Sequence, residues 1–163
     1  MTSDLNLKNK KNPLEDMVEK DSIQSITDIF ELSGVDAQEL IKSANFTELN
    51  ETHPYTLMIL KENMIDHFGE DSMFIRDTML NGLKFDYADL VYAVKNDKYG
   101  ATMTILRFID TQYNEIRYDS RELVEAVFES DDLSMVLGLR EAGYLSSGNN
   151  EQYINEQISL SGV

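Results

Sequence analysis

The sequence contains no cysteine, only two prolines and few basic residues. Without cysteine, disulfides and thiolate metal sites are excluded, and nothing indicates secretion. No stretch approaches the roughly 18 apolar residues of a membrane span, and the polar N-terminus lacks the apolar core of a signal peptide. Pro13 and Pro54 both lie outside the interiors of the predicted helices. These absences predict a soluble, cytoplasmic protein with no membrane partner.

Positive charge is scarce: 14 Lys and Arg residues stand against 30 Asp and Glu residues, for a formal net charge of −16. Residues 1–20 are balanced, so the net negative charge lies in residues 21–163. Such a surface repels nucleic acid and anionic membranes and attracts basic protein surfaces. An acidic surface can also serve only to keep a domain soluble. The charge therefore leaves two interpretations open, solubility and a basic partner.

The sequence carries few signs of catalysis. Its two histidines, His53 and His67, are not arranged as an HExxH zinc motif. Phosphate-binding, dinucleotide-binding and G-x-S-x-G motifs are absent. The acidic segment 129–132 lacks the glycine and terminal glutamate of an EF-hand loop, and helix capping by Asp131 or Asp132 accounts for it. We predict a protein that is not an enzyme and binds no metal or cofactor.

The sequence does contain a short internal repeat with a spacing of 33 residues. The segment FDYADLVYAV (85–94) is followed by YDSRELVEAV (118–127), which aligns Leu90 with Leu123. Periods of this size are typical of stacked helical units, each too small to bury its own apolar face. Strand patterns are poor throughout. The sequence therefore predicts an all-α fold of short antiparallel helix hairpins.

The hydrophobic pattern also divides the chain. Residues 1–20 show no sustained apolar period and are predicted to be a flexible N-terminal arm. Residues 21–163 are predicted to form a single acidic helical-repeat domain. Gly34 is expected to end an early helix, and Asp36 to begin the next. Two hairpins are expected, with helices near residues 87–97, 101–111, 120–130 and 132–142.

The repeated 33-residue unit resembles the ankyrin repeat. In that family a Leu and, three residues later, an Ala open the first helix; a second Leu follows about sixteen residues after the first, and a Gly closes the second helix. The second unit matches this spacing through Leu123, Ala126, Leu139 and Gly143. The first unit matches it through Leu90, Ala93 and Leu106, with Asp110 in place of the Gly.

The resemblance covers about residues 71–145 and is degenerate, because the family's Thr-Pro and Gly-His motifs are missing. It implies an ankyrin-like stack that acts by binding another protein. The alternative is a generic helical bundle whose two similar hairpins share Leu and Ala positions for packing reasons alone.

Loop tyrosines near acidic residues are typical of protein-binding surfaces, because a tyrosine offers rigid apolar area and a hydroxyl group. Tyr99 is expected in an interhelical turn, and Tyr113 in the loop that joins the two units. We predict that both lie on one edge of the stack with Glu129, Asp131 and Asp132, and that these five residues bind the partner.

Two functions from different classes remain. The first is a non-enzymatic protein–protein interaction module that binds a larger, basic-surfaced partner and inhibits or redirects it. The alternative is an acidic mimic of nucleic acid that occupies a DNA- or RNA-binding protein and contacts no nucleic acid itself. Both suit a compact, cysteine-free phage or mobile-element protein that acts on a host factor. Binding by a mimic falls steeply with salt, whereas a repeat module depends on a few anchors.

The repeat pattern predicts that Ala126 is buried where two helices cross. Replacing it in Ala126→Leu would overpack the seam between units and lower the free energy of unfolding by roughly 1–3 kcal/mol. Thermal unfolding followed by circular dichroism measures the change. An unchanged melting temperature would contradict the repeat interpretation.

Overall fold

The computed structural model describes residues 12–113, 121–129, 133–141, 155–156 and 159–160. Every regular element in these ranges is helical, which confirms the predicted all-α class. The helices are α2 (Pro13–Glu19), α3 (Ile23–Ile29), α4 (Gly34–Lys42), α5 (Leu49–Thr52), α6 (Pro54–Phe68), α7 (Ser72–Leu80), α8 (Tyr87–Lys95), α9 (Tyr99–Tyr113), α10 (Arg121–Glu129) and α11 (Leu133–Glu141).

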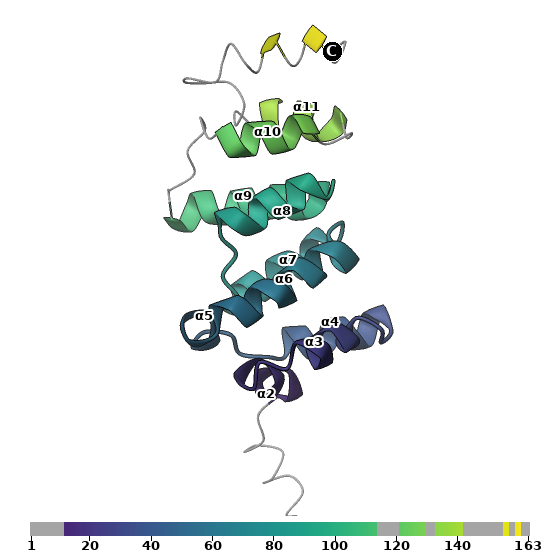
Figure 1. Cartoon of the computed structure of the whole chain (residues 1–163), viewed down its shortest axis with the longest axis vertical. Coiled ribbons are helices and arrows are strands. Elements are labelled where there is room, and N and C mark those ends of the chain that lie inside the picture. The colour runs from purple at the N-terminus through teal and green to yellow at the C-terminus, as the bar shows by residue number, and fades with distance from the viewer. Residues whose placement is uncertain (1–11, 114–120, 130–132, 142–154, 157–158, 161–163) are drawn as a thin grey trace, which may run out of the picture.

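The helices are stacked in layers along the long axis of the molecule (Figure 1). Helices α3, α6, α8 and α10 form one column, in which each helix contacts the next. Helices α4, α7, α9 and α11 form a second column in the same way. We call these the inner and outer columns. Each upper layer pairs one helix from each column: α6 with α7, α8 with α9, and α10 with α11.

The layers recur at nearly the 33-residue interval of the sequence repeat. The inner-column helices begin at Ile23, Pro54, Tyr87 and Arg121, close to 33 residues apart. The four helices predicted for the two hairpins correspond to α8, α9, α10 and α11, with ends that differ by a few residues. A chain of helix pairs stacked in sequence order is therefore present.

Side-chain caps decide where two of the outer helices begin. Ser33 Oγ accepts a hydrogen bond from the Asp36 backbone N–H at 3.2 Å and begins α4. Asp71 Oδ1 accepts from the Phe74 N–H at 3.1 Å and begins α7. The prediction that Gly34 ends a helix and Asp36 begins one is wrong. Gly34 is the first residue of α4, because Ser33 supplies the cap.

At one edge of the stack, which we call the turn edge, the turns of consecutive layers touch. The Ala101 N–H donates to Gly69 O at 2.7 Å. A β-carbon on Gly100 would lie 2.9 Å from Ser72 Oγ, and one on Gly69 would lie 2.7 Å from Lys98 Cγ. At Gly100 the two layers approach too closely for a side chain, and at Gly69 a β-carbon would also meet the backbone oxygen of Ile65 in its own helix.

At the opposite edge, which we call the linker edge, the segments between layers are joined by side-chain amides. Asn50 Nδ2 donates to Gly82 O at 2.6 Å, and Asn50 Oδ1 accepts from the Lys84 N–H at 3.1 Å. Asn81 Nδ2 donates to Lys42 O at 3.1 Å. Gly82 has a φ of +107°, a conformation that side chains disfavour. These bonds fix the spacing between layers.

The core is continuous through the layers. Leu60 and Leu90 are fully buried at the seam between α6 and α8. Small residues stand where helices lie close together, and Ala93, Ala101 and Ala126 are all buried. Ala126 is 1 % exposed, which confirms the predicted burial of this residue.

The first 20 residues differ from the prediction of a flexible arm. Residues 1–11 lie outside the described part of the chain, but α2 packs on α3, α4 and α5. Leu14 and Val18 are 0 % exposed, and Asn12 caps the helix by accepting from the Leu14 N–H at 2.7 Å. The packed domain therefore includes residues from Asn12 onward, not from residue 21. Two apolar residues four apart make one helix face, which is too little to stand out in a polar segment.

We expect Leu14→Ala to lower the free energy of unfolding by about 2–5 kcal/mol, because it leaves a cavity under α2. Deleting residues 1–20 should lower the melting temperature for the same reason. Val35→Ala is the control: Val35 is 69 % exposed, so its effect should stay within about 0.5 kcal/mol. Urea unfolding measures the two point substitutions, and thermal unfolding measures the deletion. Equal effects of the two point substitutions would show that α2 does not support the core.

Candidate functional site

The inner column has a carboxylate-rich side. The inner helices α6 and α8 are each covered by two column neighbours and by the paired outer helix, which leaves one side open to solvent. Glu62 and Asp66 lie one turn apart on α6, and Glu125 and Glu129 lie one turn apart on α10. Tyr92 belongs to α8, the helix between α6 and α10 in the column, and contacts the α6 pair through Asp66. We call these four carboxylates, together with Tyr92, the acidic face.

The hydroxyl of Tyr92 links two helices of the acidic face. It donates to both carboxylate oxygens of Asp66, each at 2.9 Å. Burial raises the pKa of Tyr92 to about 12, with further contributions from the Asp66 hydrogen bond and the Asp66 and Glu62 charges. Burial also raises the pKa of Glu62, and the Asp66 charge adds to this, partly offset by Lys61. Two carboxylates, Glu62 and Asp66, therefore lie close enough to Tyr92 to affect its ionisation.

An aromatic side chain borders the acidic face. Tyr55, directly after Pro54 in the first turn of α6, is 68 % exposed. Tyr55, Ile59, Glu62 and Asp66 follow one another at helical spacing, so they share one side of α6. The face therefore offers exposed aromatic area beside its carboxylates, the combination that anchors and orients a basic protein surface.

Beneath this surface, a buried ion pair joins α6 to α8. Lys61 Nζ lies 2.8 Å from Asp89 Oδ2 and donates to Lys84 O at 2.9 Å. The side chains of Lys61 and Asp89 are only 8 % and 2 % exposed. Asp89 Oδ2 also accepts from the Asp86 N–H at 2.8 Å, as part of the capping box that begins α8. The pair is fully hydrogen-bonded and is a structural element of the seam.

Burial raises the pKa of the Asp89 carboxyl from 3.8 to about 6, although the Lys61 charge and hydrogen bond act in the opposite direction. The folded state therefore binds this proton more tightly than the unfolded chain. The resulting contribution to stability is complete below pH 3.8 and is lost as the pH rises through about 6. At neutral pH the charged carboxylate depends on Lys61.

A polar hollow of about 650 Å³ lies at the linker edge, lined by Glu15, Glu19, Asn45, Thr47, Glu48, Leu49, Thr52 and His53. Its carboxylates already have protein partners in part, since Glu15 Oε2 accepts from the Asn45 N–H at 3.2 Å. The hollow thus combines three carboxylates with His53 at the linker edge.

Tyr99 does not lie in a turn, as expected, but is the first residue of α9. Its ring packs against α11: a β-carbon on Gly138 would lie 2.6 Å from both Tyr99 Cε2 and Tyr99 Oη. The side chain is still 37 % exposed. Tyr99 thus contributes to the seam between two layers, whether or not it also contacts a partner.

Tyr113 is the last residue of α9 rather than part of a loop. Tyr99 and Tyr113 stand at opposite ends of this 15-residue helix, about 20 Å apart at 1.5 Å per residue. The prediction that they share one edge is therefore corrected. Glu129 ends α10 and is exposed at the turn edge, as Tyr99 is, whereas Asp131 and Asp132 lie outside the described residues.

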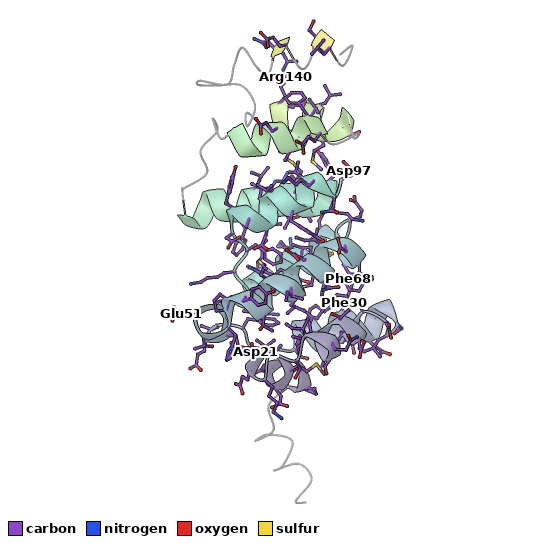
Figure 2. The ribbon with its side chains drawn as sticks, in the orientation of Figure 1. Asp21, Phe30, Glu51, Phe68, Asp97 and Arg140 are labelled. Carbon is purple, nitrogen blue, oxygen red and sulfur yellow. The ribbon has the colours of Figure 1, made fainter. Side chains whose placement is uncertain are left out.

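The turn edge also carries an aromatic group that includes one histidine. Phe30 stacks on His67 with ring centroids 5.1 Å apart, and Phe30 and Phe68 lie side by side (Figure 2). At the linker edge, His53 Nδ1 lies 3.4 Å from Asp21 Oδ1. In the described part of the chain, no three His, Cys, Asp or Glu side chains are grouped to hold a metal ion.

Sequence reasoning missed Lys61, Asp89 and Tyr55. Lys61 carried a signal, because it falls four residues after Leu57 within the apolar stripe of α6 and is therefore placed to be buried. Its partner is 28 residues away in the sequence, and only the stacking of layers brings the two together. Tyr55 carried a weaker signal, its position outside that stripe.

No protein-family model matches this sequence, and neither a curated protein nor a solved structure is significantly similar to it. The ankyrin resemblance therefore remains an expectation from the sequence. Among the described helices, none has both the length and the apolar character needed to cross a bilayer.

The buried pair predicts a pH-dependent defect. Lys61→Met removes the cation and leaves Asp89 buried without a counter-charge, so the free energy of unfolding at pH 7 should fall by about 3–5 kcal/mol. The pKa of Asp89 rises further in this variant, so its stability should decline more steeply than that of the wild type between pH 5 and 8. Urea unfolding across this range measures both effects.

The double variant Lys61→Met/Asp89→Asn is the matched control. It carries no buried charge at this position, so it should recover most of the loss at pH 7 and lose the extra pH dependence. A single variant equally destabilised at pH 5 and pH 8, or a double variant no more stable than the single one, would contradict this role for the pair.

Proposed function

We propose that this chain is a non-enzymatic protein-interaction module. It binds a basic surface on a larger partner protein and inhibits or redirects that partner. The observation that carries the proposal is the acidic face: Glu62 and Asp66 lie beside Tyr92, and Glu125 and Glu129 are exposed on α10, the next helix of the inner column. These carboxylates come from α6 and α10, two helices of the same column, which supports a shared binding face.

Electrostatics supports a basic partner. The formal net charge of −16 attracts a cationic surface over long range and raises the association rate. Burial is the main cause of the raised pKa of Glu62, and the Asp66 charge adds to it; a bound Lys or Arg side chain would reduce the part that comes from Asp66. Nucleic-acid-binding proteins are one class of partner that presents such a surface.

Tyr55 distinguishes this proposal from a pure mimic of nucleic acid. A mimic depends on charge spread over its whole surface, whereas an interaction module depends on a few anchors. Tyr55 is 68 % exposed beside the carboxylates and provides such an anchor.

The experiment begins with capture of the partner from host extract and its identification by mass spectrometry. Its affinity is then measured by surface plasmon resonance for three variants. Glu62→Gln/Asp66→Asn/Glu125→Gln should weaken binding about tenfold or more, chiefly through slower association. Tyr55→Ala should weaken binding about fivefold or more, chiefly through faster dissociation.

The third variant, Glu39→Gln/Glu51→Gln/Glu141→Gln, removes the same charge from exposed positions outside the acidic face and should change affinity less than about threefold. If the two triple variants lose affinity equally and Tyr55→Ala binds normally, the result supports a nucleic-acid mimic instead of an interaction module. Wild-type affinity in all three would show that the partner binds elsewhere.

A further inference from the structure

The outer column carries a groove of different character from the acidic face. The groove runs between α7 and α9, has a volume of about 430 Å³ and is lined by Ser72, Met73, Arg76, Leu80, Thr104, Arg107 and Phe108. It lies on the column opposite the acidic face, so the two surfaces are separate.

Large apolar side chains form one wall of the groove. Met73 is 65 % exposed and Leu80 is 67 % exposed, which is high for residues of this size. Met73, Arg76 and Leu80 follow one another at intervals of three and four, so they line one side of α7. Phe108 of α9 packs partly against the core and provides the opposite apolar wall. A methionine at the mouth lets the groove adjust to its occupant.

Charge decides which occupant fits. Arg76 and Arg107, one from each helix, are both exposed beside the apolar walls in a protein with a formal net charge of −16. The one ion pair described for Arg76 is with its neighbour Asp77 at 3.7 Å, with both side chains about half exposed, and a pair of this kind contributes little. The groove therefore places two guanidinium groups, one from each helix, beside its apolar walls.

We propose that this groove binds an amphipathic acidic helix of a partner protein. Apolar residues at i, i+3 or i+4, and i+7 of the helix occupy the space between Met73, Leu80 and Phe108. Carboxylates that flank them pair with Arg76 and Arg107, and the fork of a guanidinium suits a carboxylate.

Two synthetic 16-residue helical peptides provide the probes. Both carry the same leucine face, and the flanking positions are Glu in one peptide and Gln in the other. Fluorescence anisotropy with the full chain should give saturable binding of the Glu peptide with a Kd below about 100 µM, and binding of the Gln peptide about tenfold weaker.

Two variants of the groove are compared with two controls. Met73→Ser/Leu80→Ser and Arg76→Gln/Arg107→Gln should each weaken binding of the Glu peptide about tenfold. Val35→Ser/Leu32→Ser removes exposed apolar side chains elsewhere, and Lys95→Gln/Arg140→Gln removes exposed cations elsewhere. Both controls should bind as the wild type does, and far-ultraviolet circular dichroism verifies that every variant is folded.

Three outcomes overturn the inference: no saturable binding of the Glu peptide, equal binding of the two peptides, or equal losses in groove and control variants. Self-association in sedimentation velocity that Met73→Ser/Leu80→Ser abolishes would also overturn it, in favour of a second copy. The acidic-face variant Glu62→Gln/Asp66→Asn/Glu125→Gln should bind the Glu peptide at least as well as the wild type does. This result separates the groove from the proposed function.

Discussion

Each helix pair in this protein is too thin to bury its own apolar side, so it must be covered by the layers before and after it. This constraint accounts for most of the remaining structure. It requires small residues where layers cross, such as Ala93 and Ala126, and glycine where turns touch, at Gly69 and Gly100. It also explains why α2 is part of the domain, because Leu14 and Val18 help to cover the first layer.

One seam between layers contains an ion pair in addition to apolar side chains. Lys61 and Asp89 lie in the seam between α6 and α8, where an apolar pair would satisfy packing alone. Asp89 also completes the capping box of α8, so one carboxylate sets both the start of a helix and its contact with the previous layer. The pair depends on the alignment of α6 with α8, because a shift of one helix along the other would separate the two buried charges.

A stack of paired helices has two independent sides, and here they differ in chemistry. The inner column exposes carboxylates and Tyr55, and the outer column exposes Met73 and Leu80 with two arginines nearby. Side chains far apart in sequence meet on one side because equivalent helices repeat in the same orientation.

The sequence by itself determined the all-α class, the interval of the layers and the burial of Ala126, because these depend on hydrophobic period and on residue size, which are local or repetitive properties. It misplaced Gly34, because the competing cap at Ser33 becomes clear only when the backbone is seen. It grouped Tyr99 with Tyr113, although helix α9 holds them at opposite ends. Only the tertiary structure decided the pairing of Lys61 with Asp89, the packing of α2 and the groove between α7 and α9, because each depends on which helix sides meet across layers.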